Sequence, residues 1–141
     1  MQSSERMRRL WTLDETELRE TSASSGKTLL ATAATVGRYE MAAKLIHHGI
    51  DVNIQDRQGK TPLHHAIEND KDDIAGLLVE QGAADIDIED EYGNQPLLRA
   101  VFKGNDKVAK LLVQHGADPL HENKAGKSPL GLAREAIYHT A

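Results

Sequence analysis

A short phrase recurs along this chain every 33 or 34 residues. It reads Gly59-Lys60-Thr61-Pro62-Leu63 in its clearest copy. It returns at Gly93-Asn94-Gln95-Pro96-Leu97 and Gly126-Lys127-Ser128-Pro129-Leu130, and without its proline at Gly26-Lys27-Thr28-Leu29-Leu30. A fixed period of this length is typical of small supersecondary units that stack side by side, because one unit cannot bury its apolar face alone. The period therefore predicts a repeat protein, and such stacks present extended binding surfaces.

Each period carries the signals of two short helices. In the second unit, Thr61 can cap a first helix whose opening turn holds Pro62. Apolar residues follow at helical spacing at positions 63, 66 and 67, and again at 74, 77 and 78. Gly82 is suited to end the second helix in a left-handed conformation. In the neighbouring units we expect first helices over residues 28–36 and 95–103, turns at Gly37, Asp70 and Gly104, and second helices ending at Gly49 and Gly116.

The chain resembles the ankyrin-repeat family over roughly residues 23–137. The segments that carry the resemblance are Asp56-Arg57-Gln58-Gly59-Lys60-Thr61-Pro62-Leu63-His64, Gly49-Ile50-Asp51-Val52-Asn53 and Gly116-Ala117-Asp118-Pro119. The resemblance implies an all-α solenoid of stacked helix-turn-helix units with projecting β-hairpin loops. It also implies that His64 is structural and forms hydrogen bonds near the Thr61 cap.

The repeat divides the chain into an N-terminal capping segment, residues 1–22, and an ankyrin-repeat domain, residues 23–141. The units are predicted at about 23–55, 56–89 and 90–122, with a partial fourth unit at 123–141. Leu10, Trp11, Leu13 and Leu18 are expected to form one or two cap helices. Asp70 replaces the usual turn glycine, and Gly82-Ala83-Ala84-Asp85 has one extra residue, which predicts a local bulge.

Composition excludes several function classes. A net charge of −5 argues against a nucleic-acid partner, and no stretch of 18 apolar residues is present to cross a membrane. The chain has no cysteine, which removes disulfides, thiol catalysis and cysteine-based zinc sites. We expect a cytoplasmic protein, although a periplasmic one could also lack cysteine.

Three motifs that suggest chemistry do not carry it. Residues 21–28 resemble the end of a phosphate-binding loop, but the first glycine is missing and Gly-Lys-Thr recurs in register with the repeat. Adjacent histidines at 47–48 and 64–65 point about 100° apart on a helix, so neither pair chelates a metal easily. The acidic run at 85–91 lacks the glycine and glutamate of a calcium loop. We therefore expect no catalytic residue, no metal and no cofactor.

The acidic run has two interpretations that the sequence leaves open. It places five carboxylates in seven residues, Asp85 to Glu91. It is either a solvated loop or an acidic fingertip that attracts a partner with a basic surface. In the second case, reversing Glu89 and Glu91 to lysine would slow association.

Tyr92, Arg99 and Phe102 are the foremost candidate binding residues. The resemblance places Tyr92 at a loop tip and Phe102 at the end of a first helix on the concave side, with Arg99 one turn earlier. Such residues are frequent hot spots of protein interfaces, although Phe102 could instead pack on a neighbouring helix. The remaining predicted contacts are Arg57, Gln58, Lys60, Glu68, Asn69, Glu89, Glu91, Asn94, Lys103, Lys124 and Lys127.

These observations predict a monomeric, non-enzymatic module that binds another protein through the concave helix groove and the hairpin tips. The alternative is a dedicated inhibitor, such as an immunity protein that sequesters a toxin or enzyme with a basic active site. An enzyme is disfavoured because no acid, base or nucleophile pair lies outside the repeat register, and stacked repeats offer an open groove instead of a closed pocket.

Overall fold

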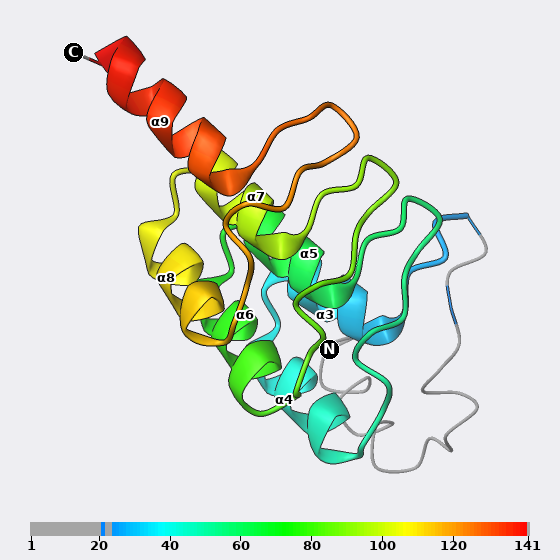
Figure 1. Ribbon diagram of the computed structural model, residues 1–141. Helices are drawn as coiled ribbons and strands as arrows, with labels where there is room; N and C mark the ends of the chain where they lie inside the picture. Colours follow the sequence, from blue (N-terminus) through cyan, green and yellow to red (C-terminus); the bar gives the residue numbers. More distant parts are fainter. Residues whose placement is uncertain (1–20, 22–23, 141) are drawn as a thin grey trace.

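The helices from α3 to α9 form two parallel rows (Figure 1). The computed structural model describes residue 21 and residues 24–140, with side chains to residue 135. The first row comprises α3 (Leu29–Val36), α5 (Pro62–Glu68), α7 (Pro96–Phe102) and α9 (Pro129–Thr140), and the second comprises α4 (Tyr39–His47), α6 (Asp72–Glu80) and α8 (Asp106–Gln114). Neighbours within each row touch, and each second helix packs on the first helix of its own unit. The predicted all-α stack of helix pairs is confirmed.

The two ends of the stack were predicted to differ from the middle units, and the structure describes only the C-terminal end. The fourth unit consists of the first-row helix α9, which packs on α7 and is the last helix of the described residues. The N-terminal cap expected at positions 10, 11, 13 and 18 lies outside the described residues. The division between residues 22 and 23 stays a prediction.

The first helices begin where the recurring phrase predicts. Thr61 is the N-cap of α5, and its side chain accepts a hydrogen bond from the His64 backbone N–H at 3.3 Å. His64 completes the capping box, because its Nδ1 accepts from the Thr61 backbone N–H at 3.2 Å. Thr28 caps α3 in the same way through Ala31. The cap predicted from the sequence, and the structural role of His64, are confirmed.

Successive loops are joined at their tips by backbone hydrogen bonds. The N–H groups of Arg57, Glu91 and Lys124 donate to the carbonyls of Ser25, Gln58 and Tyr92, at 2.9 to 3.0 Å. The loops project side by side from one edge of the helix rows (Figure 1). They are closed by tight turns, and no β-strand occurs in them within the described residues.

This close approach of the loops explains the recurring glycine. A Cβ on Gly59, which has a φ of +76°, would lie 2.9 Å from the Glu91 backbone nitrogen. A Cβ on Gly93 would lie 3.0 Å from the backbone nitrogen of Lys124. A side chain at either position would push the next loop away, so the glycines keep the stack together as well as forming the turns.

The turn that ends α6 differs from the expectation that Gly82 would adopt a left-handed conformation there. Gly82 is not left-handed; Ala83 takes that conformation instead, with a φ of +51°. Gly82 is nevertheless constrained, because a Cβ there would lie 2.9 Å from the Leu78 carbonyl oxygen. The inserted residue therefore moves the helix-ending turn one position along the chain, and a residue with a side chain adopts it.

Asp70 offers a direct test of backbone strain. It occupies the left-handed turn between α5 and α6 with a φ of +59°, where glycine has no steric penalty. We expect Asp70→Gly to raise the free energy of unfolding by about 1 kcal/mol. The lost contact to Lys103, at 3.3 Å, is exposed and contributes little. Urea denaturation measures the change.

Asp70→Asn is the matched control, since it removes the charge but keeps a side chain that tolerates the left-handed region. Its unfolding midpoint should stay near that of the native chain. A Gly variant less stable than the Asn variant would show that the carboxylate matters more than the strain.

Candidate functional site

The projecting loops are held in shape by one acceptor side chain each. Asp56 Oδ1 accepts from the backbone N–H groups of Gln58 and Lys60, at 2.9 and 3.0 Å. Asp90 does the same for the N–H groups two and four residues later, and Asn123 repeats the pattern in the fourth unit. These acceptors recur with the repeat period, which is the signal that sequence reasoning could have used to find them.

A buried histidine–carboxylate pair lies beneath the second loop. His65 Nε2 is 2.7 Å from Asp56 Oδ2, and both side chains are almost fully buried. Burial raises the pKa of Asp56, but hydrogen bonds from the Lys60 N–H, from His65 and from the Gln58 N–H outweigh it, so that pKa lies below its ordinary value. Burial lowers the pKa of His65 by more than its bond to Asp56 raises it. This pair was not predicted from the sequence.

A second buried polar chain runs from the second unit to the fourth. Because a carbonyl can only accept, His64 Nε2–H donates to the Asn94 carbonyl at 2.9 Å, while Nδ1 receives the backbone N–H of Thr61. Asn94 Nδ2 donates to Asp90, and its Oδ1 accepts from Asn123 at 2.8 Å. The Asn94 residue is only 9% exposed, so little of it is open to a partner, and its contact with one stays a prediction. Its amide joins neighbouring loops.

The acidic loop is less uniformly exposed than the sequence suggests. Asp90 is buried and accepts from backbone N–H groups and from Asn94. Glu89 is exposed and lies 2.8 Å from His121 of the next loop. Asp85, Asp87 and Glu91 also face solvent. One of the five carboxylates is thus structural, and the acidic fingertip interpretation retains four.

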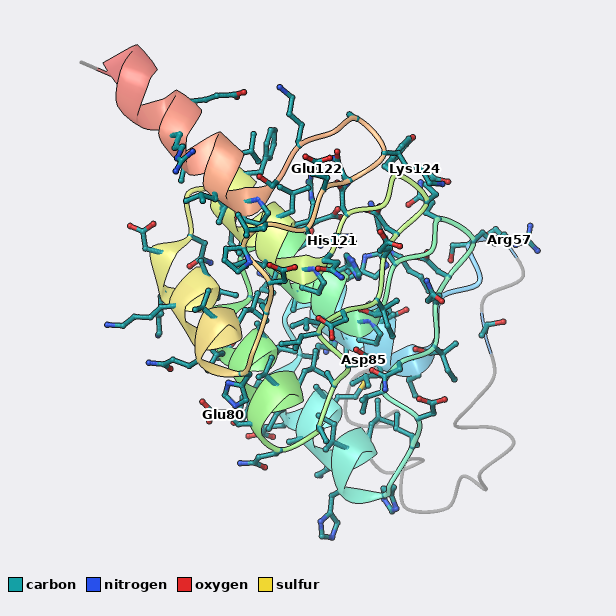
Figure 2. The ribbon with its side chains drawn as sticks, in the orientation of Figure 1. Arg57, Glu80, Asp85, His121, Glu122 and Lys124 are labelled. Atoms are coloured by element: carbon teal, nitrogen blue, oxygen red, sulfur yellow. The ribbon has the colours of Figure 1, made fainter. Side chains whose placement is uncertain are left out.

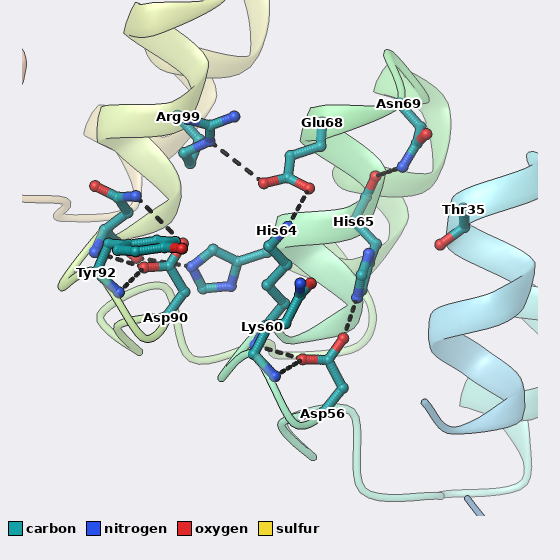
Figure 3. Close-up of polar contacts among 12 residues, drawn as sticks. Thr35, Asp56, Lys60, His64, His65, Glu68, Asn69, Asp90, Tyr92 and Arg99 are labelled. Atoms are coloured by element: carbon teal, nitrogen blue, oxygen red, sulfur yellow. Dashed lines mark hydrogen bonds and ion pairs between the residues drawn. The ribbon is translucent and has the colours of Figure 1, made fainter. Parts of the chain in front are cut away.

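An aromatic ring and a guanidinium stand together on the first-helix row. Phe102 is 66% exposed at the end of α7, and the Arg99 guanidinium carbon lies 5.1 Å from the centre of its ring. Arg99 Nε lies 3.4 Å from Glu68 Oε1 on α5, and this Nε has no hydrogen-bond partner in the described residues. Glu68 also pairs with Lys60, at 3.0 Å, so both cations point toward it (Figure 3). The predicted shared face of Arg99 and Phe102 is confirmed.

The repeat register shows why Phe102 is exposed. The positions equivalent to Phe102 are Glu68 in the second unit and Glu135 in the fourth. Glu68 pairs with Lys60 eight residues earlier, and Glu135 pairs with Lys127 at the same spacing, at 3.3 Å. In the third unit the lysine–glutamate pair is replaced by Asn94 and Phe102. The Asn94 amide joins neighbouring loops. The Phe102 ring therefore faces solvent without a pairing residue from its own loop.

The other predicted contacts fall into two groups. The exposed tip residues are Arg57, Gln58, Glu91, Tyr92 and Lys124, and Figure 2 shows Arg57 and Lys124 at the ends of the projecting loops. Tyr92 is 62% exposed. At the ends of the first helices, the Asn69 side chain donates to the His65 carbonyl, and the Lys103 ammonium donates to the Glu68 carbonyl at 2.7 Å. The tip group and the Glu68–Arg99–Phe102 group together are called the loop-side surface below.

The described residues also bear on metal and membrane binding. Among them, no three His, Cys, Asp or Glu side chains gather where they could hold a metal ion. None of the helices from α3 to α9 combines the length and apolar character required to cross a membrane.

Comparison with known proteins identifies the architecture. A family profile described as ankyrin repeats (3 copies) matches residues 30–123. The chain belongs to the ankyrin-repeat family. Ankyrin repeats generally mediate protein–protein interaction.

Individual relatives match only part of the chain and a small part of their own length. Alpha-latrocrustotoxin-Lt1a of Latrodectus tredecimguttatus is 40% identical over 52 residues, which is 36% of this chain and 4% of the toxin. The ADP-ribosylation factor GTPase-activating protein AGD4 of Arabidopsis thaliana is 38% identical over 58 residues, 41% of this chain and 8% of that protein. Neurogenic locus notch homolog protein 1 of Homo sapiens is 37% identical over 59 residues, 42% of this chain and 2% of that protein.

The buried histidines should make this ankyrin-repeat chain acid-sensitive. Burial lowers the pKa of His64 below its ordinary 6.5, more than the bond to Asn94 and the charges of Asp90 and Glu68 raise it. The unfolded chain then takes up a proton more readily than the folded chain. The stabilisation is therefore complete above about pH 6.5 and falls as the pH decreases below it. Thermal unfolding measured from pH 8 to pH 5 should show a falling midpoint.

His64→Leu is the informative variant, since Leu98 occupies the equivalent position in the third unit. We expect a lower midpoint at pH 8 and a shallower decline toward pH 5. His47→Gln, which removes an exposed histidine of α4, is the control. An unchanged slope in the His64 variant would assign the acid sensitivity to other groups.

Proposed function

We propose that this chain is a non-enzymatic module that binds another protein through the loop-side surface. The observation that carries the proposal is the exposed ring of Phe102, held beside Arg99 at the centre of the row. An exposed aromatic side chain of this size offers a large apolar area that a partner can bury. Aromatic residues and arginine are also the most common hot spots of protein interfaces.

The surroundings of Phe102 suit an interface anchor. Charged side chains adjoin Arg99 on this face: Glu68 lies 3.4 Å from Arg99 Nε, and Lys60 pairs with Glu68. Such a rim excludes water around an apolar centre while contributing little binding energy itself. Arg99 is held near Glu68, and its Nε is buried without a hydrogen bond to the described residues, so the guanidinium keeps a fixed position beside the ring.

Rigid presentation is the mechanism. The Phe102 backbone belongs to a helix packed on α5, α8 and α9, and the loop tips are tied to one another by backbone hydrogen bonds. Little conformational entropy is then lost when a partner binds. The exposed carboxylates Glu89 and Glu91, together with Asp85 and Asp87, favour a partner with a basic surface through faster association.

Affinity capture tests the role of Phe102 and Arg99. The native chain and a double variant, Arg99→Ala with Phe102→Ala, are immobilised and exposed to a lysate of the source cells. The captured proteins are then quantified by mass spectrometry. We expect the variant to lose specific partners by at least about 30-fold, the effect of removing a hot spot worth about 2 kcal/mol.

The control is Val113→Ala, which removes an exposed apolar side chain from α8 in the other helix row. Circular dichroism confirms that the variants are folded, as expected for substitutions at exposed positions. If the native chain and the double variant capture the same proteins in equal amounts, Phe102 and Arg99 are not the centre of the interface.

A further inference from the structure

The second-helix row carries a groove that the loop-side surface does not use. It follows α6 and α8 and encloses about 570 Å³. Its floor is apolar and includes Leu77 and Leu111. Glu80, on its α6 side, lies beside the second-helix row and away from the loop tips (Figure 2).

Gly76 lies in the middle of α6 and lines this groove. It does not have a positive φ, and a Cβ built on it would meet no atom within 4 Å. Neither the backbone nor the packing of the described residues therefore requires a glycine, which weakens a helix interior relative to alanine. What the glycine provides is open space at the surface of the groove.

The two sides of the groove carry opposite charges. Asp73 and Glu80 lie on α6, and Lys107 and Lys110 lie on α8. Within the described residues none of these four forms an ion pair. Asp73 and Lys107 are 34 residues apart, the offset between these two units, so they occupy the same level of successive helices. Gly76 and Lys110 share another level by the same offset.

We propose that a second copy of this chain docks in the groove, related to the first by a two-fold axis parallel to α6 and α8. Rotation about such an axis places α6 opposite α8 of the second copy and preserves the level along the helices, since both helices run in the same direction. Asp73 then faces Lys107 of the second copy, and the reciprocal pair forms by symmetry. The aliphatic stem of Lys110 from one copy then lies over the open space at Gly76 of the other copy.

Charge complementarity favours this occupant over a different protein. A uniformly acidic or basic partner would meet repulsion on one side of the groove. A second copy presents the opposite charge to each side at one level, because Asp73 and Lys107 occupy the same level of α6 and α8. The contact lies on the second-helix row, so a dimer leaves the loop-side surface free, and this inference stands independently of the proposed function. It replaces the expectation of a monomer.

Sedimentation equilibrium of the full chain tests the proposal. The mass of the native chain should rise from 15.5 kDa toward twice that value as its concentration approaches millimolar. Asp73→Lys makes the pair at its level basic on both copies, and Lys107→Glu makes the pair at that level acidic on both copies. Each should weaken self-association by at least about tenfold, because like charges then face one another.

An equimolar mixture of the two variants is the decisive measurement. The reversed positions now complement each other across the interface, so the mixture should associate although each variant alone does not. Glu40→Lys is the matched control, because Glu40 occupies the level of Asp73 on α4, outside the groove. Gly76→Leu should also weaken association while leaving the thermal midpoint of the monomer undiminished. A native chain that stays monomeric, a mixture that does not associate, or equal weakening by Glu40→Lys would each overturn the proposal.

Discussion

The fold depends on hydrogen bonds that pass from one repeat to the next beneath the loops. His64 donates to the Asn94 carbonyl, and Asn94 binds Asn123 in turn, so one polar chain links α5 to the loops of the third and fourth units. Buried polar groups are costly when unpaired, and each member of this chain has its partner in an adjacent unit. If one unit slid along the next, several of these polar groups would lose their hydrogen-bond partners. The Ala- and Leu-rich contacts between helices would tolerate such a shift better.

Much of the architecture could be predicted from the sequence, because it depends on local residue types. The period, the Thr61 cap and the left-handed turn at Asp70 all follow from what a residue can do with its own backbone. Contacts between units could not be predicted in this way. Asn94 was expected among the contact residues at a loop tip, yet the neighbouring loop approaches closely enough to bury it. The shift of the helix-ending turn from Gly82 to Ala83 is instead local, because it follows from the residue inserted after α6.

The candidate site was only partly visible for a related reason. That Arg99 and Phe102 share a face follows from helical spacing, and the structure bears it out. The connection of Arg99 to Glu68 required knowledge of how close α5 and α7 pack. The pairs Lys60–Glu68 and Lys127–Glu135 could have been found by aligning the units with one another. That alignment would have singled out Phe102 as the residue that departs from a recurring ion pair.

Positions that repeat and positions that vary have different physical roles, and the two faces of this chain illustrate both. Leu45, Leu78 and Leu112 occupy one level of the second helices and are buried throughout, since each packs between the rows. Glu40, Asp73 and Lys107 occupy another level, reach solvent and change sign along the stack. Packing does not constrain a charge at that level, so a reversal of sign between α6 and α8 costs the fold little. A stack of near-identical units can therefore carry distinct surfaces, because its variable positions are the ones that the core does not hold.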